Sequence, residues 1–192
     1  MPNLLALAIL VTFSLNSVAG ELIYRCGSNV FSDTKCGEDA HVIDVKHDTI
    51  KTIEGNVIKV SDGDTLTVVT ADNKYKIRLA RIDAPEISHF GKPAQPFGKE
   101  AGTHLRQILD GKVVSVDIEA IDQYGRSVGT VYLNHQNVNL TMVEDGYAWV
   151  YREYSNGGDD LMMLEKDARR KRIGLWMLDD PIYPSQFRKA HK

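Results

Sequence analysis

The sequence has 192 residues, of which 43% are hydrophobic, 26% charged and 8% aromatic. This composition is typical of one folded domain with some additional chain, and it excludes a collagen and an intrinsically disordered protein. The formal net charge is −3, from 23 Lys and Arg against 26 Asp and Glu. The protein therefore has no overall positive field that would draw it to nucleic acid, and any binding of polyanions must be local.

The first 20 residues carry no charged side chain, and residues 4–15 are almost entirely apolar. A helix of that apolar length rises about 18 Å, which is short of the ~30 Å hydrocarbon core of a membrane. Small residues follow at Ser17, Val18 and Ala19. We therefore expect residues 1–20 to be a signal peptide, and the protein to be exported to a periplasm or secreted, with no membrane anchor.

Residues 21–50 are expected to form a small N-terminal hairpin module. They contain the only two cysteines, Cys26 and Cys36, and an even pair in an exported protein favours a disulfide. A zinc site formed by these cysteines with His41 and His47 is the alternative. It has suitable ligand atoms, but the short paired spacings of such sites are absent, so the sequence favours the disulfide.

From residue 51 onward, β-branched runs alternate with turn signals. The pattern predicts strands at 52–60, 64–70, 74–82, 112–121 and 127–133, and helices at about 97–110, 140–145 and 159–173. This order is that of a five-stranded Greek-key barrel, the OB-fold, in a mainly β chain with about three helices (α+β). We place the barrel domain at 51–180 and a C-terminal tail at 181–192.

Charged side chains gather at three of the predicted strand ends. The three segments are Asp62-Gly63-Asp64-Thr65, Asp83-Ala84-Pro85-Glu86 with Arg78 upstream, and Asp122-Gln123-Tyr124-Gly125-Arg126. Each segment by itself is explained as an ordinary turn, because Asp and Gly are the commonest residues of tight turns. Only their combination indicates a function.

In this combination and order, the chain resembles the staphylococcal nuclease (thermonuclease) family over roughly residues 55–178. Besides the three turns, the resemblance rests on Val57-Ile58-Lys59, Ile77-Arg78-Leu79, Gly98-Lys99-Glu100-Ala101 and Gly174-Leu175-Trp176. The resemblance implies a calcium-dependent enzyme that hydrolyses phosphodiester bonds of DNA and RNA with little sequence preference and leaves 3′-phosphate ends.

The resemblance also assigns roles to particular residues. Asp64, Asp83 and the main-chain carbonyl of Ala84 would hold the calcium ion, and hard oxygen ligands suit this hard cation. Well-known members usually have Thr at the position of Ala84, an exchange that a main-chain ligand tolerates. Glu86 matches the carboxylate that orients or deprotonates the attacking water.

Two arginines, Arg78 and Arg126, match those that grip the reacting phosphodiester. A guanidinium donates two parallel hydrogen bonds to phosphate oxygens and stays charged at any working pH. The family resemblance further suggests that Tyr151 and Tyr154 contact the substrate, although aromatic residues beside Trp149 more often belong to the core.

Side chains along a regular strand alternate between the two faces of the sheet, and this limits which residues can meet at one site. Arg78 and Asp83 are five residues apart, so a regular strand would direct them to opposite faces of the sheet. We therefore predict a bulge or bend between Leu79 and Ile82.

The leading hypothesis is thus an exported nuclease that acts as a monomer on DNA and RNA, with calcium as its cofactor. The alternative is a non-catalytic OB-fold module that binds oligonucleotides. The presence of all five residues of the charged set favours the enzyme; they are Asp64, Arg78, Asp83, Glu86 and Arg126.

Overall fold

The structure is a computed structural model of the chain, and it describes residues 23–25, 31–32, 41–43, 51–88, 91–152 and 159–191. The chain divides into two compact units, Met1–His47 and Asp48–Lys192. Residues 1–20, predicted as a signal peptide, lie outside the described residues. Within those residues, none of the helices combines the length and the apolar character needed to cross a membrane.

The first unit contains a small antiparallel sheet. Its strands are β1 (Ile23–Arg25), β2 (Phe31–Ser32) and β3 (His41–Ile43), in the order β2-β1-β3. The predicted hairpin therefore has a third strand. Cys26 and Cys36 lie outside the described residues, as does His47, so the disulfide and the zinc alternative stay predictions.

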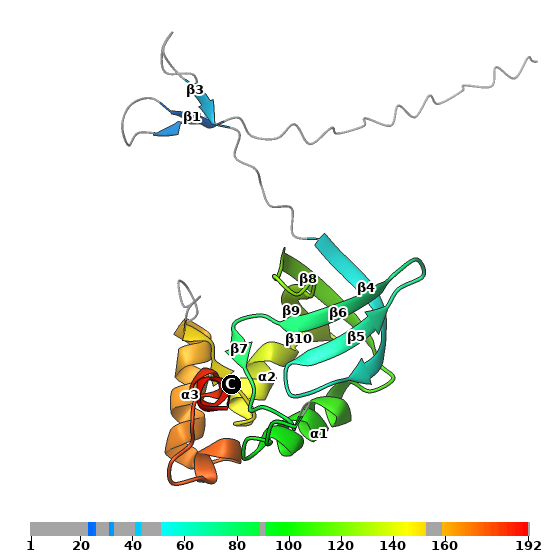
Figure 1. The fold of residues 1–192 in the computed structure, drawn as a ribbon. Helices are drawn as coiled ribbons and strands as arrows, with labels where there is room; N and C mark the ends of the chain where they lie inside the picture. The colour runs from blue at the N-terminus through cyan, green and yellow to red at the C-terminus, as the bar shows by residue number, and fades with distance from the viewer. Residues whose placement is uncertain are drawn as a thin grey trace, which may run out of the picture. The chain divides into compact units, whose positions relative to one another are not determined.

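The second unit is built on a closed five-stranded barrel of the OB type (Figure 1). The strands are β4 (Lys51–Val60), β5 (Thr65–Val69), β6 (Lys74–Leu79), β8 (Val113–Ile121) and β9 (Ser127–Leu133). Strands β4, β5 and β6 form an antiparallel meander, β8 pairs with both β4 and β9, and β9 closes the barrel by parallel pairing with β6. The predicted α+β class and the five-stranded OB barrel are confirmed.

Alternation within β4 shows how the sequence forms this barrel. Ile53, Gly55 and Val57 point inward at a period of two, and the next buried residue is Val60. The period changes because the register shifts between Val57 and Lys59, where β4 bulges opposite β5. The bulge coils the strand, which lets a sheet of five strands close on itself.

The predicted bend after Arg78 is present. Strand β6 ends at Leu79, and a turn at Ala80 and Arg81 follows, in which Arg81 adopts a left-handed backbone with φ of 63°. The chain then forms β7 (Ile82–Asp83), which leaves the barrel and pairs with β11 (Trp149–Val150). The predicted strand 74–82 is therefore two strands in different sheets.

Helices cover one end and one side of the barrel (Figure 1). They are α1 (Gly98–Leu109), α2 (Val138–Glu144, after the short strand β10 at Gln136–Asn137), α3 (Asp159–Lys171), the 3-10 helix η2 (Gly174–Met177) and α4 (Pro184–Ala190). The sequence predicts the first three. It treats 181–192 as a tail, whereas α4 buries Pro184 and Phe187 against the domain.

The last turn of α3 is basic, and its first arginine has a structural partner. The guanidinium of Arg169 lies 4.7 Å from the ring centroid of Trp149 and 3.9 Å from that of Trp176, and it pairs with the buried Glu165. Glu165 in turn accepts the amide hydrogen of Val150 at 2.9 Å. This cluster joins α3 to β11 and thereby supports the strand that pairs with Asp83.

Candidate active site

The turn between β4 and β5 places Asp64 at the barrel end. A Cβ at Gly63 would lie 2.6 Å from Cβ of Ala84 and 2.7 Å from Cβ of Ala101, so only glycine allows the turn to approach both segments this closely. One carboxylate oxygen of Asp64 accepts the amide hydrogen of Ala84 at 2.8 Å. The other accepts the hydroxyl of Thr65 at 3.1 Å. Two segments distant in sequence are thus joined at this carboxylate.

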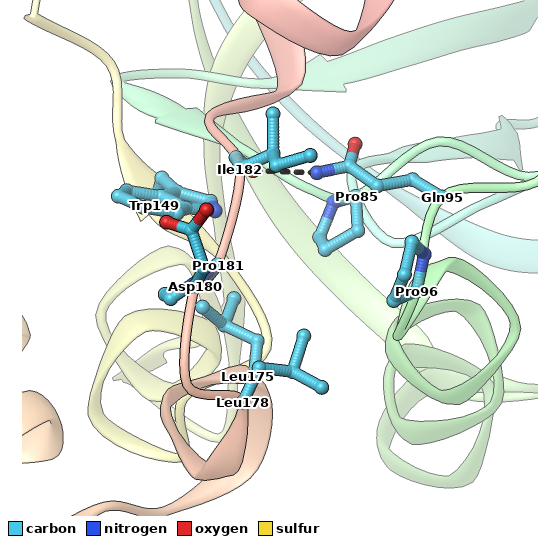
Figure 2. Close-up of a pocket in the computed structure, with 9 residues that line it drawn as sticks. All are labelled: Pro85, Gln95, Pro96, Trp149, Leu175, Leu178, Asp180, Pro181 and Ile182. Atoms are coloured by element: carbon cyan, nitrogen blue, oxygen red, sulfur yellow. Dashed lines mark hydrogen bonds between the residues drawn. The ribbon is translucent and has the colours of Figure 1, made fainter.

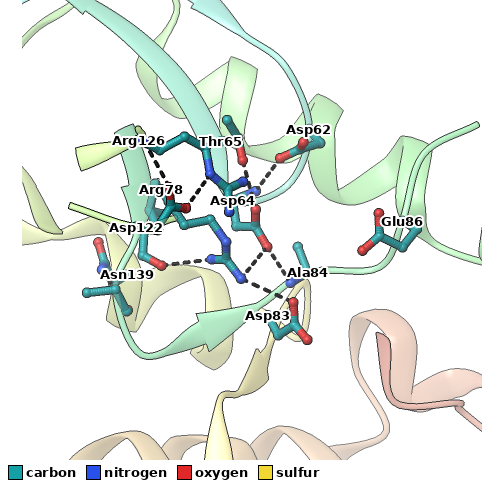
Figure 3. A network of polar contacts seen from close by, with 12 residues as sticks. Asp62, Asp64, Thr65, Arg78, Asp83, Ala84, Glu86, Asp122, Arg126 and Asn139 are labelled. Atoms are coloured by element: carbon teal, nitrogen blue, oxygen red, sulfur yellow. Dashed lines mark hydrogen bonds and ion pairs between the residues drawn. The ribbon is translucent and has the colours of Figure 1, made fainter. Parts of the chain in front are cut away.

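Arg78 links the two aspartates that the sequence assigns to a cation. Its Nη2 lies 3.2 Å from Oδ2 of Asp64 and 3.1 Å from Oδ1 of Asp83. Figure 3 shows the guanidinium in contact with both carboxylates. Its Nη1 donates to the carbonyl of Leu79 at 2.8 Å. Because one nitrogen contacts both carboxylates, the two acidic groups lie on either side of a single guanidinium.

Asp83 is more deeply buried than Asp64, and its side chain is 1% exposed. Burial raises its pKa, and the charge of Asp64 adds to this increase, while hydrogen bonds and charges from Arg188 and Arg78 oppose it. A carboxylate in this position needs cations around it, because an unpaired buried charge is costly.

Glu86 is held by its backbone in a loop after β7. Its amide donates to Oε1 of Gln95 at 3.2 Å, and its carbonyl accepts the amide hydrogen of Gln95 at 2.8 Å. The loop also presses against the start of α1, where a Cβ at Gly98 would lie 2.1 Å from the carbonyl oxygen of Glu86. Glycine at this position is therefore required for the observed placement of Glu86.

Arg126 follows the turn between β8 and β9 and is oriented by Asp122. One oxygen of Asp122 accepts the amide hydrogens of Tyr124 and Arg126, each at 2.9 Å. The other accepts Nε of Arg126 at 2.7 Å. Burial by itself would raise the pKa of Asp122, but these hydrogen bonds and the charge of Arg126 lower it overall. Within the described residues this guanidinium makes no other hydrogen bond, so its outer edge is available to a ligand.

The predicted residues share one acidic pocket. The residues that line it are Asp62, Asp64, Thr65, Asp83, Ala84, Pro85, Glu86, Arg126 and Arg188. The structure thus brings five of the six predicted catalytic and metal-binding residues to one pocket, and the sixth, Arg78, contacts its carboxylates. Tyr151 follows β11, donates its amide hydrogen to the carbonyl of Arg81, and is not among the lining residues. Tyr154 lies outside the described residues.

Sequence reasoning missed three polar residues that complete the site. Asp62 lies in the same turn as Asp64; burial and then the charge of Asp64 raise its pKa from 3.8 to about 7. Asn139 is buried on α2 and donates to the carbonyl of Ala80 at 3.0 Å and that of Gly129 at 3.2 Å. The shared turn is a signal for Asp62. No local signal identifies Asn139, whose role depends on contacts distant in sequence.

The third missed residue is Arg188 of α4. Its Nη1 and Nη2 lie 3.1 and 3.0 Å from the two oxygens of Asp83, and its Nη1 lies 2.6 Å from Oε1 of Glu86. Nothing in the local sequence distinguishes this arginine from the neighbouring Lys189, since both lie in a basic segment near the end of the chain.

The chemistry of the pocket fits a hard divalent cation. The oxygens of four carboxylates line it, and carboxylate and carbonyl oxygens are the ligands that calcium prefers. Asp64 and Asp83, which the family resemblance assigns to the cation, both line this pocket. Among the described residues, no three His, Cys, Asp or Glu side chains are gathered closely enough to form a metal centre. Guanidinium groups instead stand between the carboxylates.

Comparison with known proteins agrees with this arrangement. A profile of the family described as staphylococcal nuclease homologue matches residues 76–178, more than half of the chain. The chain belongs to this family. The match begins within β6, ahead of Arg78, and ends before α4, so Arg188 lies beyond it.

Similar proteins bear nuclease names. An uncharacterized endonuclease of Haemophilus influenzae is 43% identical over 138 residues, which cover 71% of this chain and 73% of that protein. A micrococcal nuclease of Shigella flexneri is 37% identical over 148 residues, or 72% of this chain and 82% of that protein. Endonuclease Htp3 of Saprolegnia parasitica is 35% identical over 165 residues, or 74% and 78%.

Proposed function

We propose that the protein is a nuclease that hydrolyses phosphodiester bonds of DNA and RNA with calcium as its cofactor. The observation that supports this most directly is that three segments at the ends of strands converge on one pocket. Asp64, Asp83 and Glu86 provide carboxylates there, and Arg126 provides a guanidinium from a different turn. The family and the names of its relatives agree with this function.

Arg126 is the residue best prepared to bind the substrate phosphate. Asp122 fixes the guanidinium through Nε, so the two terminal nitrogens face a ligand as a planar fork. Negative charge increases on the phosphate oxygens as water attacks, and a fixed donor stabilises that charge more than the charge of the resting diester. Arg78 adds positive charge between Asp64 and Asp83.

Glu86 is proposed to hold the attacking water and to accept its proton. Its side chain lines the pocket and is 35% exposed, so solvent reaches it. The water oxygen bonds to phosphorus as Glu86 takes one of its protons, the bond to the 5′ oxygen breaks, and that oxygen takes up a proton from solvent. Each cleavage consumes one water and yields a 3′-phosphate and a 5′-hydroxyl. A bound calcium ion would supply positive charge for the phosphate oxygens and offset the acidic pocket.

An oligonucleotide-binding module without activity is the second candidate, because the OB barrel occurs in such proteins. An assay of nucleic-acid cleavage with calcium or with a chelator distinguishes the two functions. We expect single-stranded DNA and RNA to be degraded with calcium and left intact with a chelator, with 3′-phosphates on the products. Binding without cleavage in calcium would favour the module. Cleavage that is unaffected by the chelator would reject the metal-dependent mechanism.

A matched pair of variants tests the pocket itself. Glu86→Gln removes the proton acceptor and should lower kcat on the order of 10²-fold, as expected for loss of a general base. Glu144→Gln makes the same chemical change on the exposed face of α2 and should leave cleavage unchanged. Equal activity of the two variants would exclude Glu86 from catalysis.

We further propose that the protein is exported and that Cys26 pairs with Cys36. The apolar residues 4–15 and the even cysteine count support both proposals. Secreted or periplasmic protein should begin after Ala19 or Gly20 by N-terminal sequencing. Peptide mapping without reductant should recover the two cysteines in one linked peptide, and free thiols at both positions would contradict the pairing.

A further inference from the structure

Arg188 makes the most extensive ionic contact in the pocket, although it lies outside the segment that matches the family. Its two terminal nitrogens contact both oxygens of Asp83, at 3.1 and 3.0 Å, and one of them also contacts Glu86 at 2.6 Å. The contact is therefore bidentate on one carboxylate and bridges to a second, and bidentate contacts between a guanidinium and a carboxylate are strong charge-assisted hydrogen bonds.

The segment that leads into α4 is held next to the site by hydrogen bonds to two other parts of the chain. Gln95, which binds the backbone of Glu86, also donates its Nε2 to the carbonyl of Ile182 at 2.6 Å (Figure 2). Tyr183 donates its hydroxyl to the carbonyl of Val150 at 3.2 Å and packs edge-on against Trp149. Phe187 is buried one residue before Arg188. The arginine is thus positioned by the fold.

This position conflicts with the binding of a cation. The side chain of Asp83 is 1% exposed, and its oxygens already contact Arg188 and Arg78. A divalent ion needs at least one of these oxygens as a direct ligand. Arg78 contacts only Oδ1, so it leaves Oδ2 accessible, whereas Arg188 contacts both oxygens and Glu86 as well. Arg188 and the ion therefore compete for the same carboxylates.

We propose that Arg188 is a built-in competitor of the divalent cation, which occupies the acidic pocket until the cation displaces it. The proposal rests on the proposed metal-dependent function. With Arg188 in place, Glu86 is paired and Asp83 is fully engaged, so the pocket is inactive. When Arg188 withdraws, both carboxylates become available together. The fraction of molecules in which the Arg188 side chain occupies the pocket thereby sets the calcium concentration at which the enzyme works.

Calcium affinity measured by isothermal titration calorimetry tests this without any turnover. The full-length mature protein is compared with Arg188→Ala and with Arg188→Met, which keeps the apolar part of the side chain. Both variants should bind calcium about 10-fold more tightly, because an occluded form populated nine-tenths of the time weakens the apparent affinity by that factor. Circular dichroism of each variant verifies that α4 and the barrel remain folded.

Lys189→Ala is the matched control, since it removes one positive charge from the adjacent position of the same helix. Lys189 is exposed and forms no ion pair within the described residues. The control should bind calcium with the affinity of the wild type. A comparable gain in this variant would show that general charge, and not the contact with Asp83, controls the affinity, and it would overturn the proposal.

The remaining outcomes separate the inference from the proposed function. Unchanged calcium affinity in both Arg188 variants, with cleavage still dependent on calcium, would overturn the competitor and leave the nuclease intact. Unchanged affinity together with a raised KM would make Arg188 a substrate-binding residue instead. If neither the wild type nor the variants bind calcium, the metal-dependent mechanism fails, and the competitor fails with it.

Discussion

The guanidinium of Arg78 lies 3.1 Å from the carboxylate of Asp83, although a continuous strand would direct these two residues to opposite faces of the sheet. The turn at Ala80 and Arg81 makes the contact possible, because it ends β6 and redirects Asp83 into β7. The active-site geometry therefore depends on a break in the barrel, and the residues that stabilise this break are part of the functional design.

Replacement by lysine should have different consequences at Arg78 and at Arg126. In Arg78→Lys, one ammonium replaces a fork that contacts Asp64, Asp83 and the carbonyl of Leu79, so buried carboxylates lose partners. We expect the free energy of unfolding to fall by about 2–3 kcal/mol, together with a loss of cleavage. In Arg126→Lys, cleavage should fall while stability changes little. Urea denaturation and a cleavage assay on both proteins test the contrast, which equal destabilisation would contradict.

Asp122 is expected to act through the orientation of Arg126. Asp122→Asn keeps the size of the side chain but weakens the ionic contact with Nε. We predict a fall in kcat/KM of about 10-fold, smaller than the 10²–10³-fold expected for removal of a catalytic donor. The matched control is Asp117→Asn, since Asp117 contacts Thr52 on the exposed barrel surface. Steady-state kinetics measure kcat/KM of both variants. Full activity of Asp122→Asn would exclude an orienting role.

The pKa of Asp122 predicts how its contribution to stability varies with pH. Its pKa in the folded protein lies below the ordinary 3.8, so ionised Asp122 stabilises the fold above that value. The contribution is lost as the pH falls through the folded pKa. The difference in unfolding free energy between the wild type and Asp122→Asn should therefore be constant above pH about 5 and shrink in acid. A difference that grows in acid would contradict the direction of the shift.

Gly98 is expected to tolerate no side chain. A Cβ there would lie 2.1 Å from the carbonyl oxygen of Glu86, so Gly98→Ala must displace the loop that carries the proposed base. We expect a loss of about 1–3 kcal/mol of stability and a lower kcat. Gly102→Ala on the same helix is the control, because its Cβ would meet Cα of Asp62 at an acceptable 3.4 Å. Helix propensity should make this control neutral or stabilising in thermal unfolding.

Asn139 is expected to hold the break between β6 and β7. Asn139→Asp keeps the shape but cannot donate to the carbonyls of Ala80 and Gly129, which leaves a buried charge beside two acceptors. We predict a loss of about 3 kcal/mol or more, with reduced cleavage in the folded fraction. Asn137→Ala removes the N-terminal cap of α2 and should cost about 1 kcal/mol while leaving cleavage intact. Chemical denaturation and specific activity measure both effects.

Local patterns in the sequence were sufficient for much of this protein. Periodicity of two marked the barrel strands. The Asp-Gly-Asp turn pointed to the pocket only through the resemblance to the family, and the spacing of Arg78 and Asp83 required a bend only because that resemblance places both residues at one site. The strand periodicity depends on neighbours within a few residues, which is the range over which propensity and side-chain alternation act.

Only the tertiary structure revealed the partners that complete the site. Asn139 reaches Ala80 across 59 residues, and Arg188 reaches Asp83 across 105. No pattern within either segment specifies such a contact, because it arises when packing brings distant backbones together. The amino-acid sequence alone thus determined which chemical groups the protein carries and which turns present them. Packing decided which charges neutralise one another, since a buried carboxylate takes whatever cation the fold places within reach.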